Sequence, residues 1–176
     1  KTAIDNATTN DAVTQAKNDG AASVASVNPT AQAKPAAKQA IDDALKAKTD
    51  AIDANNDLTA EEKAKAKEDA KAKADAAKQA IDNATTNDVV TQAKNDGAAS
   101  VASVTPAAVV KSAAKQAIDE VLKAKNDEID ARTDLTDEEK TEAKAEAKKK
   151  ANAAKEAIDK ATTNAAVDQS KSTGTT

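Results

Sequence analysis

Apolar residues recur at steps of three and four through most of the chain, and this spacing predicts a succession of amphipathic helices. The first predicted helix runs from about residue 30 to 54. One face of this helix carries Ala37, Ile41, Leu45, Lys48 and Ile52. A second helix begins at Thr59, with a face of Ala66, Ala70, Ala74, Ala77 and Ile81. A third follows Thr86, with a face of Val90, Ala93, Gly97, Val101 and Val104.

Polar residues mark where these helices begin. Thr59 and Glu62 form a capping box, in which each side chain satisfies a backbone amide of the other, and Thr136 with Glu139 repeats it. Asn28-Pro29 and Thr105-Pro106 read as an N-cap followed by proline at the first helical position. The first helix of each unit is therefore expected to begin immediately after the preceding third helix. Pro35, whose counterpart is Ser112, predicts either a later start or a kink in the earlier copy.

Gly97 leaves two interpretations open. It ends the triplet Asn95-Asp96-Gly97, which in isolation signals a turn. The apolar register nevertheless continues through it at steps of four, which favours one continuous helix with Gly97 at a close helix contact. The same choice applies to Gly20, because TQAKNDG occurs at 14–20 as well as at 91–97.

A tandem repeat organises the chain, since the same sequence recurs at a constant offset of 77. Residues 3–27 recur at 80–104 with a single difference, Ala12 against Val89, and 36–63 recur at 113–140. Residues 1–27 are thus expected to be the C-terminal part of a preceding repeat, 28–104 a complete three-helix repeat, and 105–176 a second repeat with a shortened last helix. Three helices joined by short turns place the two ends of a unit at opposite poles. The prediction is an all-α fold of tandem three-helix bundles stacked end to end into an elongated rod, each about 37 Å long.

Composition removes many functions from consideration. The 176 residues include no aromatic residue, Cys, Met or His, and 47 of the 69 apolar residues are Ala. Thiol chemistry, imidazole catalysis, Cys/His metal sites and base stacking are excluded. A net charge of −4 with interleaved signs argues against nucleic acid, and no apolar run approaches the roughly 18 residues of a membrane span. With so few large apolar residues, the bundles are expected to be marginal alone and stabilised by their neighbours.

Three groups of residues could carry chemistry, and each has a structural interpretation that we favour. Asp53, Asn55 and Asp57 alternate like calcium ligands, but the glycine and glutamate that complete such a loop are missing, so a turn is expected. Glu61 and Glu62 are a carboxylate pair that fits the positive end of a helix. Residues 148–150, three lysines, could contact an anionic polymer but fit a solvated helix face. The sequence therefore predicts no catalytic, cofactor-binding or metal-binding residue, and no enzyme.

Two ordered motifs carry a resemblance to a known family. AIDANNDLTAEEKAKAK at 51–67 and AAKQAIDNATTNDVVTQAKNDG at 76–97 are followed by matching stretches at 128–144 and 153–171. Over essentially its whole length the chain resembles the repeats of domain of unknown function 1542. These repeats occur in cell-wall-anchored surface proteins of Gram-positive bacteria, such as staphylococcal surface protein C and streptococcal adhesins.

The resemblance implies stalk or spacer repeats of a cell-surface adhesin, which project an adhesive region from the cell wall. The alternative is that the repeats themselves bind a host extracellular protein or self-associate in cell aggregation and biofilm. Neighbouring repeats of the same chain are the expected partners, without cofactor, nucleic acid or membrane insertion, and the chain is expected to be a monomer. The family has no assigned catalytic residues to carry over.

Overall fold

The structure is a computed structural model that describes residues 1–175, and these residues form helices without β-strands. Thr176, the last residue of the predicted second repeat, lies outside the described residues. In chain order the helices are α1 (Thr2–Asp5), α2 (Asn10–Ala25), α3 (Ala33–Ala54), α4 (Ala60–Asn83), α5 (Asn87–Ala102), α6 (Val110–Ala131), α7 (Asp137–Lys160) and α8 (Asn164–Thr175).

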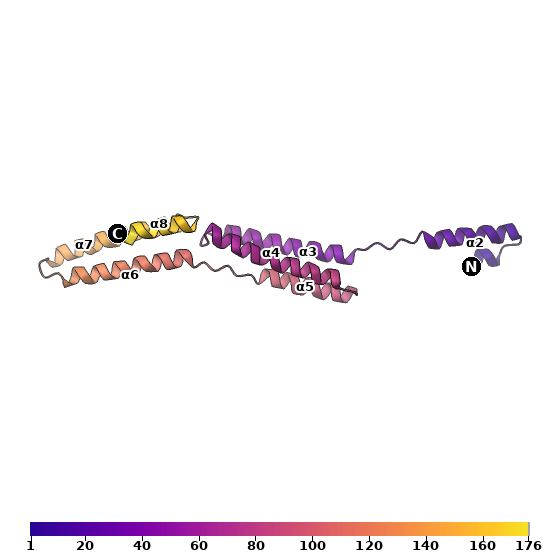
Figure 1. Ribbon diagram of the computed structural model, residues 1–176, viewed down its shortest axis with the longest axis horizontal. Coiled ribbons are helices and arrows are strands. Elements are labelled where there is room, and N and C mark those ends of the chain that lie inside the picture. Colours follow the sequence, from indigo (N-terminus) through magenta and orange to yellow (C-terminus); the bar gives the residue numbers. More distant parts are fainter. Residues whose placement is uncertain (176) are drawn as a thin grey trace.

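Two three-helix bundles follow one another along a single axis (Figure 1). Helices α3, α4 and α5 pack together, and α6, α7 and α8 form the second bundle. Helices α1 and α2 contact each other at one end of the molecule, away from both bundles (Figure 1). The predicted fold, all-α bundles stacked end to end into a rod, is confirmed.

Most predicted helix starts agree with the structure. The side chain of Thr59 accepts a hydrogen bond from the Glu62 amide at 3.3 Å, and Thr59 and Glu62 form the complete capping box, as do Thr136 and Glu139. Thr86 caps α5 by accepting from the Val89 amide. Local side-chain chemistry therefore fixes where these helices begin.

The predicted start of the first helix in each unit is wrong. Pro29 and Pro106 do not open helices, since α3 begins at Ala33 and α6 at Val110, and the residues before them are non-helical. The reason is a difference in length: α5 has 16 residues, whereas α3 and α4 have 22 and 24. At 1.5 Å per residue α5 stops about 10 Å short of its partners. Residues 103–109 then lead as a non-helical segment from α5 to the next bundle (Figure 1).

Pro35 does not delay the helix that contains it. Helices α3 and α6 begin at equivalent positions of their repeats, although Pro35 in one copy stands where the other has Ser112. Pro35 lies in the first turn of α3, where an amide hydrogen is not needed for an intrahelical bond. The expected later start is therefore wrong.

Alanine forms much of the buried core, as the apolar faces predicted. Ala70 and Ala74 of α4 have no exposed surface, and Ile41 and Ile81 are equally buried beside them. The core of the first bundle comprises Ala37, Ile41, Ala74, Ala77, Ile81, Ala84, Val90 and Val101. Methyl side chains on facing helices allow the backbones to approach closely, but each buries little apolar area.

Gly97 lies inside the continuous helix α5, and the break considered from the sequence is wrong. A Cβ atom at Gly97 would overlap the Ala77 methyl group and lie 3.0 Å from Ile41 Cδ1. Gly174 of α8 stands in the same way against Ala154 and Ile118. The glycine is required for close helix packing rather than for backbone conformation, because no glycine of the described residues has a positive φ.

Three ion pairs connect the first two helices of each bundle. In the first bundle Lys38 pairs with Asp82, Lys78 with Asp42 and Lys67 with Asp53. The equivalent pairs of the second bundle are Lys115–Asp159, Lys155–Asp119 and Lys144–Asp130. Their carboxylates are about half exposed, so each pair contributes little free energy alone. Together they favour one register between antiparallel helices whose alanine faces are nearly uniform.

Replacing Gly97 by Ala is expected to destabilise the first bundle, because the new methyl group overlaps Ala77. Overpacking of this kind costs about 1–3 kcal/mol and outweighs the helix-propensity gain of about 1 kcal/mol. Urea unfolding followed by far-UV circular dichroism measures the change.

Gly20→Ala is the matched control, since nothing lies within 4 Å of a Cβ at that position. The Gly20→Ala variant should leave the midpoint of urea unfolding unchanged or raise the helical content. A Gly97→Ala variant as stable as the wild type would contradict the close contact.

Candidate functional site

Hydrogen bonds connect the first bundle to the second at the junction where the two meet. Across the described residues, no group of three or more His, Cys, Asp or Glu could hold a metal ion. A search of the same residues finds no helix long and apolar enough to cross a membrane.

The three groups singled out from the sequence lie in structural roles. Asn55 Oδ1 accepts from the Asp57 amide at 2.9 Å, which closes the turn between α3 and α4. The Asp53 side chain pairs with Lys67, and its carbonyl accepts from Lys63 Nζ at 2.8 Å. The lysines at 148–150 are exposed on α7. The turn that contains Asn55 and Asp57 lies beside Ala108 and Lys111 of the next bundle, but of the three groups only Glu61 and Glu62 bind that bundle through their side chains.

Glu62 joins the N-termini of two helices. Its Oε2 atom accepts from the Thr59 amide at 2.9 Å, and its Oε1 atom accepts from the amides of Val109 and Val110 at 2.9 and 3.0 Å. Helix α6 has no side-chain cap from its own N-cap residue, Val109. The second bundle thus receives the cap of its first helix from the first bundle.

A second pair of contacts lies between the start of α4 and the start of α8. Glu61 Oε2 accepts from the Asn164 amide at 3.0 Å, and the Ala60 amide donates to the Thr162 carbonyl at 2.7 Å. Both adjacent carboxylates at the start of α4 therefore bind backbone amides of the next bundle. Negative side chains are stabilised at helix N-termini, where unpaired amides create a positive potential.

The protonation state of Glu62 follows from these contacts. Burial alone would raise the pKa of this carboxyl, but hydrogen bonds from the amides of Thr59, Val110 and Val109 hold the pKa below its ordinary value of 4.5. A lowered pKa in the folded state means that the ionised form stabilises the fold. This contribution is fully present above pH 4.5 and is lost as the pH falls through the lower folded value.

Lys111 is a buried lysine at the centre of the junction. Its side chain is 5% exposed, and Nζ donates to the carbonyls of Asn56 and Asp159, both at 2.8 Å. Asn56 belongs to the α3–α4 turn and Asp159 to the last turn of α7, so the ammonium joins both bundles at carbonyl-rich helix ends. Lys34, its counterpart in the first bundle, donates to the Asp82 carbonyl and is less buried.

Apolar side chains are also buried at the junction. Ile52, Leu58 and Ala66 form a buried cluster at the end of the first bundle, and Ala108 of the linking segment packs against it. At the free end of the second bundle the equivalent Leu135 is only partly buried. The difference shows that the following segment, rather than the bundle itself, completes the burial of this leucine position.

Sequence reasoning identified Glu62 as part of a capping box and, with Glu61, as a carboxylate pair at a helix start, but it did not predict a contact with the next bundle and did not single out Lys111. A comparison of residues 28–35 with 105–112 could have identified Lys111 from the sequence. Only the proline, one alanine and one lysine are identical there, and the alanine and lysine are the junction residues Ala108 and Lys111.

Replacing Glu62 by Ala is expected to weaken the junction as well as the start of α4. Loss of the two α6 hydrogen bonds should lower the free energy of unfolding by about 1–2 kcal/mol, beyond the loss of the capping box. The amides of Val109 and Val110 should also exchange faster with solvent, which hydrogen exchange by NMR measures residue by residue.

Glu139→Ala is the matched control, because Glu139 forms the same capping box but accepts no amide of another bundle. Unchanged exchange at Val109 and Val110 in the Glu62 variant would show that its carboxylate does not cap α6.

Comparison with known proteins identifies a family whose model matches this chain. The model of the family described as Domain of Unknown Function (DUF1542) matches residues 33–109 and 110–176. The extracellular matrix-binding protein EbhA of Staphylococcus aureus strain Mu3 is 31% identical over 168 residues, which cover 96% of this chain but 2% of that protein. The protein of the same name from strain Newman is also 31% identical, with 96% and 5% covered. The chain thus spans only a small part of these curated relatives. No solved structure matches it.

Proposed function

The chain belongs to the DUF1542 family, and on that premise we propose that it is a structural spacer in the stalk of a cell-surface adhesin. The stalk projects an adhesive region from the cell wall of a Gram-positive bacterium. The relatives are named as extracellular matrix-binding proteins of Staphylococcus aureus and are far longer than this chain, which supports many repeats in series. The chain is proposed to act without catalysis or cofactor, with neighbouring repeats as its main partners.

The observation that carries the spacer role is the capping of one bundle by the next. Glu62 caps α6, Glu61 binds the start of α8, and Lys111 joins the α3–α4 turn to the end of α7. Contacts from three different helix ends resist bending at the joint more than a single flexible linker would. We propose 28–104 and 105–176 as the repeating units, with 1–27 as the end of a preceding one.

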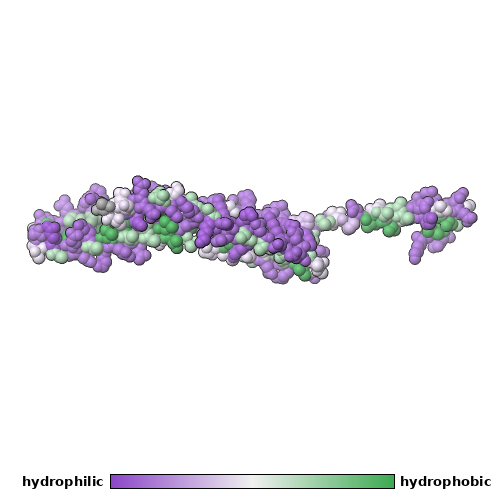
Figure 2. All heavy atoms as spheres, in the orientation of Figure 1, coloured by the Kyte–Doolittle hydropathy of each residue, from purple (hydrophilic) through white to green (hydrophobic). Residues whose placement is uncertain are grey.

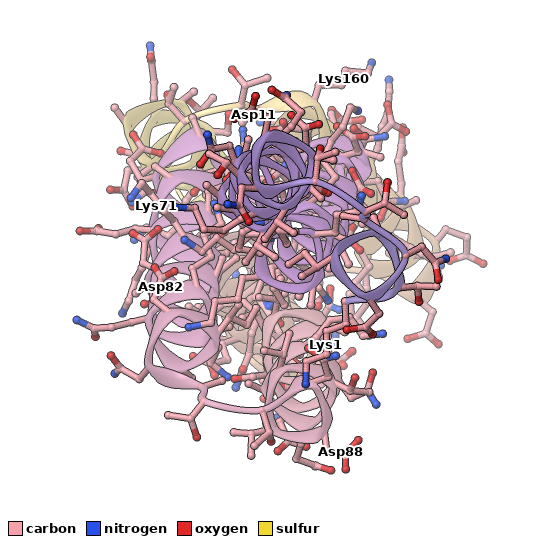
Figure 3. All side chains as sticks on the ribbon, turned by 90° about the vertical axis from the view of Figure 1, so that its right-hand side faces the viewer. Lys1, Asp11, Lys71, Asp82, Asp88 and Lys160 are labelled. Atoms are coloured by element: carbon pink, nitrogen blue, oxygen red, sulfur yellow. The ribbon has the colours of Figure 1, made fainter. Side chains whose placement is uncertain are left out.

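The surface suits a solvated rod. Hydrophilic residues cover most of the visible face of the two bundles (Figure 2). In the view along the long axis, the labelled Lys71, Asp88 and Lys160 lie at the periphery (Figure 3). Charges of both signs around the rod, with a net charge of −4, favour solubility without a strong single-sign field.

Small-angle scattering tests the spacer geometry. A compact globule of this length has a radius of gyration of about 16 Å, whereas the rod should give roughly twice that value. Each added repeat should increase the maximum dimension by about 35–40 Å. A radius of gyration equal to that of the compact globule, or units that fold back and leave the maximum dimension unchanged, would reject the stalk.

Binding of a matrix protein by the repeats themselves is the second candidate, favoured by the names of the relatives. The surface offers no aromatic or Met anchor, and its single arginine, Arg132, is held by Asp134 in two hydrogen bonds. Tight interfaces usually depend on Tyr, Trp and Arg. We therefore expect no binding at micromolar concentration to purified matrix proteins on a biosensor surface. Saturable binding of the monomer would favour this candidate over the spacer.

A further inference from the structure

One carboxylate binds two helices of different bundles at the junction. Glu62 Oε2 accepts from the Thr59 amide of its own capping box, and its Oε1 atom accepts from two amides at the start of α6, those of Val109 and Val110. Both oxygens must act as acceptors to satisfy these donors at the same time. A protonated carboxyl carries a hydroxyl donor on one of its oxygens. Protonation of Glu62 is therefore incompatible with keeping both sets of hydrogen bonds.

The hydrogen bonds to α6 are the set that protonation removes more easily. Thr59 lies three residues before Glu62, so its amide stays beside the carboxyl whatever the second bundle does. Val109 and Val110 are held there by the packing of one bundle on the next, after a non-helical segment at residues 103–109. Helix α6 has no side-chain cap from its own N-cap residue. Without the carboxylate, its first amides would bind water instead.

Other contacts across the junction do not depend on a carboxylate. Lys111 Nζ donates to the Asn56 carbonyl at 2.8 Å. The Ala60 amide donates to the Thr162 carbonyl at 2.7 Å, and Ala108 packs against the apolar cluster at the end of the first bundle. Acid alters neither a lysine ammonium nor a backbone carbonyl. These contacts would hold the bundles together after α6 loses its cap, so the joint would become more flexible rather than come apart.

Charged groups of both signs surround the Glu62 contact. Those that line the two clefts beside the junction are Asp57 of the α3–α4 turn, Lys63 of α4, Lys111, Lys115 and Asp119 of α6, and Asp159 and Lys160 of α7. Helix α8 has no charged residue in its first turn, where Glu61 accepts from the Asn164 amide. Burial raises the pKa of Glu62, but hydrogen bonds from backbone amides lower it by more, to below 4.5. The amide contacts, rather than an ion pair, therefore stabilise the ionised form.

We propose that Glu62 makes the stiffness of the joint sensitive to acid. While ionised, it fixes the start of α6 to the first bundle, and once protonated it releases that start, so that the two bundles reorient while each remains folded. The contact is complete above pH 4.5 and is lost as the pH falls through the lower pKa of Glu62 in the folded chain. As a control of spacer stiffness, the proposal rests on the proposed function.

The bundles themselves are expected to respond to acid later than the joint. Each keeps a buried core of Ala, Ile and Val, which does not titrate. The ion pairs between their helices have carboxylates that are about half exposed, and each such pair contributes little free energy. A range of pH therefore exists in which the start of α6 is released and both bundles are folded.

Spin labels on the two bundles measure the freedom of the joint. The chain has no cysteine, so two labels can be placed at chosen positions. Lys65→Cys on α4 and Lys148→Cys on α7 replace exposed residues. Pulsed electron paramagnetic resonance then gives the distribution of distances between the labels. This distribution should be narrow at about pH 7 and about twice as wide at about pH 3, because protonated Glu62 releases α6.

A label pair within the first bundle is the reference. Lys65→Cys and Asn95→Cys place both labels at exposed positions, on α4 and α5. The distribution of distances for this pair should be the same at both pH values. If it broadens together with that of the pair between the bundles, acid unfolds the bundle instead of releasing the joint, and the proposal is overturned.

Glu62→Gln separates the charge of this side chain from the pH of the solution. Glutamine keeps one acceptor oxygen, which is enough for a capping box, but presents an amide donor in place of the second oxygen. At about pH 7 this variant should already show the broad distribution that the wild type shows in acid. A narrow distribution for Glu62→Gln at neutral pH would overturn the proposal.

Glu139→Gln is the matched control. Glu139 Oε2 accepts from both the amide and the hydroxyl group of Thr136, so one acceptor oxygen suffices for this capping box. The variant should behave like the wild type at both pH values. Broadening equal to that of Glu62→Gln would assign the effect to capping boxes in general and overturn the proposal. These outcomes do not depend on the spacer role, which fails separately if scattering at neutral pH shows a compact globule.

Discussion

Close packing of helices over alanine faces is the constraint on which the structure depends. Ala70, Ala74 and Ala77 present only methyl groups, and Gly97 removes even the methyl group where α5 crosses Ala77. Helices can then approach closely, but each contact buries little area, so the fold cannot rely on hydrophobic burial alone. Helix caps, ion pairs between helices and contacts with the next bundle must supply the rest of the stabilising free energy. This explains why so many charged side chains of the chain have defined structural partners.

The polar interactions follow one physical rule, which is that charge is placed at helix ends. Glu61 and Glu62 bind amides at N-termini, and Lys34, Lys63 and Lys111 bind carbonyls at C-terminal turns. Several of these amides and carbonyls belong to the neighbouring bundle. The hydrogen bonds that cap a helix therefore also connect one bundle to the next. A rod whose units share caps gains stability with each added neighbour, in the manner of other repeat proteins. The same shared caps would stiffen the proposed spacer without a large interface between bundles.

Near-identity of the repeats has a second consequence. The faces of α3 and α4 are identical to those of α6 and α7, so they do not by themselves distinguish one third helix from another, although the third helices differ, as at Ala93 and Ser170. Specific partner choice within the chain then depends on tethering, because the loop between two helices keeps the correct one at high local concentration.

Periodicity and local chemistry in the sequence determined the helices, their apolar faces, the threonine caps and the tandem repeat. Helices, faces and caps depend on residues within a few positions of one another, and the repeat is visible by self-comparison, so a single sequence contains them all. The start of α3 and α6, the dual role of Glu62 and the burial of Lys111 were decided by tertiary structure. Their cause is nonlocal: α5 is shorter than the helices it packs on, and the non-helical segment that makes up the difference brings residues 109–111 to the ends of helices that are distant in the chain. A local sequence pattern does not predict the effect of this difference in helix length, because the effect arises only when the three helices pack side by side.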